Sequence, residues 1–304
     1  MTVINTNISG MIGLNNMRLT NLGLKQSLER LSSGLRINKG ADDPSGLAIA
    51  KGMESHIGGV RTAVMNAEDG ISLIHTADGA LAETHDILMR MRDLAVRAAN
   101  EATLTSRDVS RINNEMQSLK QELQRKSQAV TFNTKVLFSG GYSGGNQQML
   151  QIGPDNGTNY RLTIEVWAMT NSGLFMVSGT KQANWLGGGS LLISNVSSGA
   201  STTGNQATGA LSMAWIAIDY LNSSINFVSD LRASLGIQER RLGHVIDDLK
   251  AEDINISAAK SRIWDADMAS EISEFTRLQI LQQSGTAILA QANAQPQSIL
   301  QLLR

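Results

Sequence analysis

One apolar stripe in the first third of the chain constrains the fold more than any other feature. Apolar residues there alternate at steps of four and three without an exception: Met53, Ile57, Val60, Val64, Ala67, Ile71 and Ile74. This is the heptad spacing of a coiled coil, in which a narrow seam on one helix packs against a partner helix. Such a helix cannot bury its seam alone, so other parts of the chain must cover it.

The helix that carries this seam is predicted to be long. Asp43 before Pro44 is typical of an N-cap followed by proline in the first turn, and the next proline is Pro154. The sequence therefore predicts one helix from residue 44 to about residue 100, roughly 80 Å long at 1.5 Å per residue. After Ile74 the apolar stripe shifts by one place, as a nearly straight helix requires, and continues as Ile87, Met91, Leu94 and Ala98.

Three polar residues interrupt the heptad frame of this helix: Asp78, His85 and Arg92. We interpret Asp78 and Arg92 as a solvated or partner-facing strip, with a register-setting polar contact between helices as the alternative. We interpret His85 as a partly exposed polar interruption and not as a ligand, since none of the four histidines belongs to a His-Glu-x-x-His metal pattern.

Further apolar stripes predict four more helices: over residues 5–34, over residues 109–130, from residue 211 towards residue 256, and from about residue 266 onward. The helix over residues 109–130 is expected to pack antiparallel on the long helix. Residues 139–205 differ, because they hold nearly half of the 28 glycines and two β-prone runs, RLTIEVWAM and LLISNV. Turn signals around these runs predict short hairpins.

These elements predict a mainly α chain with a small β region, in which long paired helices flank a central β-hairpin insertion. We expect paired terminal helices over residues 1–44 and 265–304, a helical rod over residues 45–138 and 205–264, and an outward β-hairpin segment over residues 139–204. The last segment ends on Leu300, Leu302 and Leu303. Chain ends are usually polar, so we expect assembly to cover this one.

Composition argues against several classes of function. Lys and Arg number 26 and Asp and Glu 27, for a net charge of -1, so the chain lacks the basic field that attracts nucleic acid or anionic lipid. Cysteine is absent, which excludes thiolate metal sites. The N-terminus lacks the pattern of a secretory signal peptide, and no run reaches the ~20 apolar residues of a membrane span. Without a phosphate loop or a nucleophile elbow, we expect no enzyme and no cofactor.

Two terminal segments closely resemble bacterial flagellin: LERLSSGLRINKGADDPSGLAIA and SRIWDADMASEISEFTRLQILQQSGTAILAQANAQPQSILQLLR. AEDGISLIHTADGALAETHDILMRMRDLAVRAANE and FNTKVLFSG extend the likeness. The resemblance implies a structural subunit that polymerises into the flagellar filament for motility, and the alternative is a hook-filament junction protein. By this likeness the innermost layer of the filament is formed by the terminal helices, through Leu24, Leu28, Leu31, Leu35, Ile288, Leu289, Ile299, Leu300, Leu302 and Leu303.

The same resemblance implies where the chain acts and what it meets. It implies type III export without a cleaved signal peptide to an extracellular filament, an export chaperone on the C-terminal helix, and filament cap and junction proteins. The segment MRMRDLAVRAAN implies recognition by a Toll-like receptor of animal hosts through Arg90, Leu94 and Glu115. Met89 and Trp264 depart from the family pattern, and Ser and Thr of the central segment are candidate sites for O-linked sugars.

Overall fold

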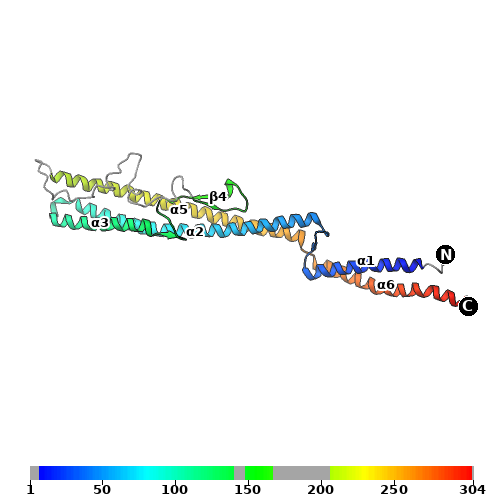
Figure 1. Cartoon of the computed structure of the whole chain (residues 1–304). Helices are drawn as coiled ribbons and strands as arrows, with labels where there is room; N and C mark the ends of the chain where they lie inside the picture. The colour runs from blue at the N-terminus through cyan, green and yellow to red at the C-terminus, as the bar shows by residue number, and fades with distance from the viewer. Residues whose placement is uncertain (1–6, 140–147, 167–205, 303–304) are drawn as a thin grey trace. The chain divides into compact units, whose positions relative to one another are not determined.

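The computed structural model describes residues 7–139, 148–166 and 206–302 (Figure 1). Five long helices account for most of these residues: α1 (Ile8–Ser33), α2 (Pro44–Ala98), α3 (Ser106–Ala129), α5 (Gln206–Trp264) and α6 (Met268–Leu302). The shorter elements are η1 (Glu101–Thr103), β1 (Thr131–Phe132), β2 (Lys135–Val136), β3 (Gln148–Gln151), η3 (Thr158–Tyr160) and β4 (Arg161–Ile164). The predicted fold class, mainly α with small β-hairpins, is confirmed.

The chain divides into two compact units. Unit 1 consists of Met1–Gly58 and Glu252–Arg304, and unit 2 consists of Gly59–Ala251. The helices α2 and α5 contribute to both units, whereas α1 and α6 belong to unit 1 alone. The sequence predicts three domains, with boundaries near residues 44, 139, 204 and 265. This domain division stays a prediction.

Unit 2 has a core of large apolar side chains from α2, α3 and α5. The heptad prediction for α2 is confirmed at one of its two positions, since Val60, Ala67 and Ile74 are at most 1% exposed. At the other position Val64 and Ile71 are only half-buried, and the buried residues lie one place earlier, at Ala63, Gly70 and Ala77. Fully burying a Val, Leu, Ile or Met side chain contributes roughly 1.5–3 kcal/mol, so the core stabilises the unit strongly. The largest fully buried side chains of these three helices are Ile74, Leu81, Leu88, Met91, Met116, Leu235 and Leu242.

The order of the helices in unit 2 is shown by ion pairs along their length. Arg90 of α2 pairs with Glu115 of α3 at 2.6 Å, and Glu83, earlier in α2, pairs with Lys126, later in α3. The two helices are therefore antiparallel, as predicted from the sequence.

A local sequence signal sets the start of α2. Asp43 Oδ1 accepts the Gly46 N–H at 2.9 Å, which confirms the predicted N-cap.

Two antiparallel hairpins complete unit 2, β1 with β2 and β3 with β4. The β3–β4 hairpin packs on α2 where that helix has glycines. A Cβ at Gly59 would lie 2.8 Å from Pro154 Cβ, and one at Gly70 would lie 2.5 Å from Leu150 Cδ2, so each glycine leaves space for the hairpin. Strand β4 confirms the first part of the RLTIEVWAM prediction, whereas the run LLISNV lies outside the described residues.

Candidate assembly surface

Local sequence signals set the limits of α1 and α6. Asn7 Oδ1 accepts the Gly10 N–H at 2.9 Å and so caps the start of α1. Gly34, at φ 72°, ends α1 in the left-handed conformation that glycine adopts without a steric penalty. Asp267 Oδ1 accepts the Ala269 N–H at 3.0 Å at the start of α6. The structure therefore has helices close to the predicted residues 5–34 and from residue 266 onward.

The helices α1 and α6 pack against each other in antiparallel orientation (Figure 1). Asn7 Nδ2 donates to the carbonyl of Ala292 at 3.1 Å, and Gln282 Nε2 donates to Asn21 Oδ1 at 2.8 Å. At the other end Ser27 Oγ donates to the carbonyl of Glu271 at 3.4 Å. The terminal helices thus pair with each other within one chain, as the sequence predicts.

Small residues form much of the contact between α1 and α6. A Cβ on Gly13 would lie 3.4 Å from Leu289 Cδ1, and one on Gly23 would lie 3.3 Å from Leu278 Cδ1. Ser27 is the only buried residue of α1. Leu278 is the only buried residue among the α6 side chains that the structure describes. The glycines of α1 therefore leave space for leucines of α6, and the contact combines small residues of α1 with Leu278 and Leu289.

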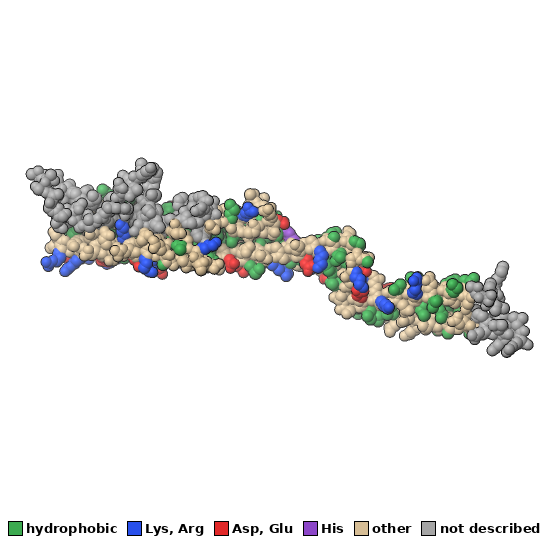
Figure 2. Space-filling model, viewed as in Figure 1, with side chains coloured by type: hydrophobic (Ala, Val, Ile, Leu, Met, Phe, Trp, Pro, Cys, Tyr) green, Lys and Arg blue, Asp and Glu red, His purple; other side chains and the backbone are tan. Residues whose placement is uncertain are grey.

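Twelve large apolar side chains of this hairpin are exposed (Figure 2). Their exposed fractions run from 43% at Met268 to 65% at Met11. Large apolar side chains exposed in this number on one hairpin indicate an interaction site. We call the following set the apolar face: Ile8, Met11, Ile12, Leu14, Leu19, Leu22 and Leu28 of α1, with Met268, Ile272, Ile280, Leu281 and Ile288 of α6.

The ten predicted assembly residues fall into three groups. Leu28 and Ile288 belong to the apolar face, at 55% and 61% exposed. A second group is half-buried and consists of Leu24, Leu31, Leu35 and Leu289. The side chains of Ile299, Leu300 and Leu302 and the whole of Leu303 lie outside the described residues. Sequence reasoning missed the other members of the apolar face, although the glycines at the inner positions of α1 could have indicated which side of this helix faces α6.

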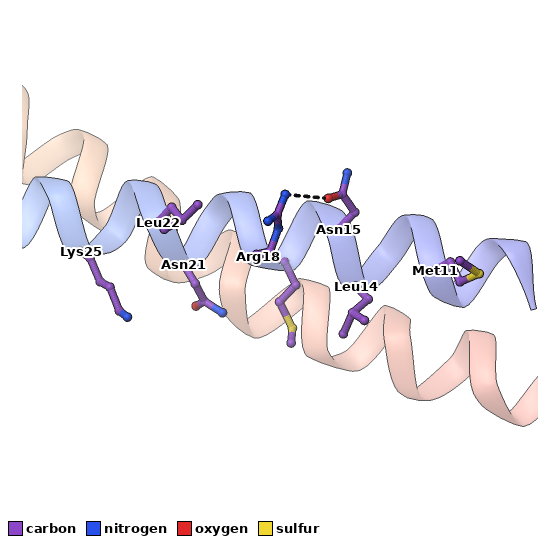
Figure 3. Close-up of a pocket in the computed structure, with 8 residues that line it drawn as sticks. Met11, Leu14, Asn15, Arg18, Asn21, Leu22 and Lys25 are labelled. Atoms are coloured by element: carbon purple, nitrogen blue, oxygen red, sulfur yellow. Dashed lines mark hydrogen bonds between the residues drawn. The ribbon is translucent and has the colours of Figure 1, made fainter. Parts of the chain in front are cut away.

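A groove of about 560 Å³ crosses the apolar face on α1 (Figure 3). All of its lining residues come from this helix: Met11, Leu14, Asn15, Met17, Arg18, Asn21, Leu22 and Lys25. Its charged lining residues are Arg18 and Lys25. Elsewhere charge is scarce, since no other charged residue occurs between residues 8 and 24 and none occurs between residues 278 and 303. Covering this surface therefore desolvates few charges, which removes a major cost of association.

The two segments that connect the terminal hairpin to α2 and α5 are joined by main-chain hydrogen bonds within unit 1. The Arg36 N–H donates to the carbonyl of Trp264 at 2.7 Å, and the Ala266 N–H donates to the carbonyl of Gly34 at 2.9 Å. The Arg36 guanidinium also donates to the carbonyl of Ile263, 2.6 Å from Nη2, at the end of α5. These bonds explain why Leu35 and Asp265 form an isolated β-bridge.

Trp264, which departs from the family pattern, is buried at this joint. Trp264 is 9% exposed, and its ring centroid lies 4.9 Å from Lys51 Nζ and 5.3 Å from Lys260 Nζ, which gives two cation–π contacts. Glu54 accepts from Lys51 at 2.8 Å. This hydrogen bond, with the charge of Lys260, lowers the pKa of the Glu54 carboxyl. The aromatic side chain thus anchors the end of α5 on the start of α2.

In unit 2, polar side chains connect α2 with α5. Arg232 Nε donates to Asp78 Oδ1 at 2.7 Å, and Arg92 Nε donates to Asn222 Oδ1 at 2.7 Å. The alternative interpretation of Asp78 and Arg92, a polar contact between helices, is therefore confirmed. His85 is half-buried, and no group of three or more His, Asp or Glu residues that could hold a metal ion occurs among the described residues.

The three residues predicted for receptor contact lie together on α2 and α3. Arg90 and Glu115 are exposed and form an ion pair, whereas Leu94 is only 3% exposed and packs in the unit 2 core. Receptor recognition stays a prediction. None of the described helices is long and apolar enough to cross a membrane.

Comparison with known proteins identifies the chain. The bacterial flagellin N-terminal helical region matches residues 4–143, and the bacterial flagellin C-terminal helical region matches residues 218–303. Flagellin of Bacillus subtilis (strain 168) is 41% identical over 99% of both chains. The flagellar filament 33 kDa core protein of Treponema phagedenis is 35% identical over 99% of this chain and 100% of its own length.

The solved structures include a crystal structure of Bacillus cereus flagellin that covers 64% of this chain and 94% of its own, at 25% identity and a TM-score of 0.44. The two matched regions, with 41% identity along 99% of the chain, show which family the chain belongs to. The chain therefore belongs to the bacterial flagellin family, the structural subunits from which flagellar filaments are built.

Proposed function

We propose that this chain polymerises into an extracellular flagellar filament through the apolar face of α1 and α6. The observation that carries the proposal is that α1 and α6 bury Leu278 against Gly23 and still leave the twelve large apolar side chains of the apolar face 43–65% exposed. Burial of apolar surface contributes about 25 cal/mol per Å². Neighbouring copies that cover the face would gain this energy, which the free chain cannot gain alone.

The geometry favours a filament over a closed oligomer. Exposed apolar residues lie on α1 and on α6, so one copy can present α1 to a neighbour while its α6 meets another. Contacts of this head-to-tail kind extend without limit unless the rotation between copies closes a ring. In this function the chain carries mechanical load and catalyses no reaction. Leu24, Leu31, Leu35 and Leu289, half-buried beside the face, would contribute to the same contact.

The remaining partners are finer proposals from the same family resemblance. An export chaperone would cover the apolar residues of α6 before assembly, which suits the exposure of Ile280 and Ile288. Cap and junction proteins would meet the same hairpin at the filament ends. The exposed Arg90–Glu115 pair supports a Toll-like receptor contact, in which buried Leu94 would act by holding α2 in place. Relatives matched along 99% of this chain are filament proteins, which supports the filament subunit over the hook-filament junction alternative.

Seeded growth tests the central proposal. Purified chain is added to short filament fragments, and filament length is followed by negative-stain electron microscopy. We expect long uniform filaments from the full chain and none from a variant that lacks residues 265–304. Circular dichroism of the deletion variant serves as the control that α2, α3 and α5 remain folded. Long filaments from a folded deletion variant would show that α6 is not needed and that the proposal is wrong.

A further inference from the structure

We propose that the thioether of Met11 is a modification site for peroxides, and that its conversion to the sulfoxide blocks polymerisation of the free chain. The inference rests on the proposed function, because it requires the α1 side of the apolar face to be a subunit contact. It adds a chemical control on that contact.

The structure separates the methionines into accessible and protected groups. The chain has 13 methionines and no cysteine, so thioethers are its main sites for two-electron oxidation. Met11 is 65% exposed and lines the α1 groove with Leu14 and Leu22 (Figure 3). Met91 and Met116, in the core of unit 2, are each 1% exposed. A peroxide therefore meets Met11 in the free chain long before it meets the core methionines.

The reaction needs only the peroxide as co-reactant. The Met11 sulfur attacks one peroxide oxygen, an S–O bond forms and the O–O bond breaks. Sulfur loses two electrons, and hydrogen peroxide is reduced to water after a proton moves to the departing oxygen. The side chain gains one oxygen atom and changes from a flexible apolar group into a polar one with a strong hydrogen-bond acceptor.

Charged donors near Met11 are few, and the amide of Asn15 is the donor one turn away in the same groove. The nearest charged donor along α1 is Arg18, seven positions away and therefore roughly 10 Å along the helix axis. Its guanidinium already donates to Asn15 Oδ1 at 3.4 Å. Burying an unpaired polar group in an apolar contact is costly, so we expect the sulfoxide to raise the concentration needed for growth about tenfold. The subunit contact that the sulfoxide blocks would also shield Met11 once the filament has formed.

Three forms of the full chain test the inference: the natural sequence, Met11→Leu and Met149→Leu. Met149 lies on β3 in unit 2 and is 66% exposed, which matches Met11 in accessibility. Each form is treated with hydrogen peroxide, catalase removes the excess, and growth from untreated seeds is measured. The readout is the ratio of treated to untreated growth for the same form, so the effect of the substitution itself cancels.

We expect the ratio to fall about tenfold for the natural sequence and for Met149→Leu. For Met11→Leu we expect a clearly smaller fall, because Met17 of the groove and Met268 of the apolar face can still be oxidised. A ratio near one for the natural sequence would overturn the inference, as would an equal fall for Met11→Leu. If the untreated natural chain fails to grow at all, the proposed function fails and the inference fails with it. Normal untreated growth with no effect of peroxide contradicts the inference alone.

Mass spectrometry supplies a second readout that does not depend on growth rates. Free chain and finished filaments receive the same peroxide dose, and the sulfoxide fraction is measured at Met11, Met149 and Met91. We expect Met11 to be oxidised in the free chain and protected in the filament, while Met91 stays intact in both. Equal oxidation of Met11 in the two samples would show that assembly does not cover it, which contradicts the inference.

Discussion

The two helix pairs of this protein use apolar residues in opposite ways. In unit 2, α2 and α5 place Ile74, Leu88 and Leu235 between them, at 1% exposed or less. In unit 1, Gly23 of α1 leaves space for Leu278 of α6, whereas Leu14 and Ile288 stay exposed. The first arrangement stabilises one chain on its own. The second leaves apolar side chains exposed, and these can stabilise contacts with other copies of the chain.

The difference explains how one chain can be folded and ready to polymerise. Large apolar side chains buried within unit 2 contribute to folding in the monomer. The same residue types on the outside of α1 and α6 contribute nothing until a neighbour covers them. Folding stability and assembly are thereby assigned to different residues. Substitutions should separate these two properties.

The largest effect is expected from a charge on the apolar face. Leu14→Asp should slow seeded growth about a hundredfold, because an unpaired carboxylate buried at a contact costs about 3 kcal/mol or more. Thermal unfolding of the monomer should change little, since Leu14 is 58% exposed. Ile237→Asp, at a position 59% exposed on α5 of unit 2, is the matched control and should slow growth less. Equal losses from the two variants would mean that the apolar face has no special part in assembly.

A core truncation should give the opposite result. Leu81→Ala, at a fully buried position of α2, should lower the free energy of unfolding by about 2–5 kcal/mol. Leu22→Ala, at a position 55% exposed on α1, should lower it by less than about 0.5 kcal/mol in the monomer. Urea unfolding followed by circular dichroism measures both. The comparison between the helix pairs fails if Leu22→Ala destabilises the monomer as much as Leu81→Ala does.

The smallest effect distinguishes the inner and outer glycines of the terminal hairpin. Gly285 of α6 has no atom within 4 Å of an added Cβ, so Gly285→Ala should raise monomer stability by up to about 1 kcal/mol through helix propensity. Gly23→Ala should gain less or lose stability, because its Cβ would lie 3.3 Å from Leu278 Cδ1. Helicity measured against temperature compares the two variants. If both gain equally, α1 and α6 are less closely packed than the structure shows.

The prediction of the rod helices succeeded because their signal is local. The heptad steps of α2, and the stripe of α5 through Leu221, Val228 and Leu235, specify which side of each helix is buried whatever its partner is. The terminal helices were predicted to exist and to pair, but the sequence could not show that their inner contact uses glycine and serine. Apolar residues occur on several sides of α1, so periodicity alone could not identify the side that faces α6.

The sequence by itself therefore determined the helices, the buried seam of the rod and the family, because periodicity and motif are properties of consecutive residues. Only the tertiary structure decided which groups meet across the chain. It pairs Asp78 with Arg232, brings Lys51 and Lys260 to the ring of Trp264, and leaves Met11 exposed while Met91 is buried. These contacts depend on the distance and orientation between segments that are far apart in sequence, and the spacing within one helix carries no information about either.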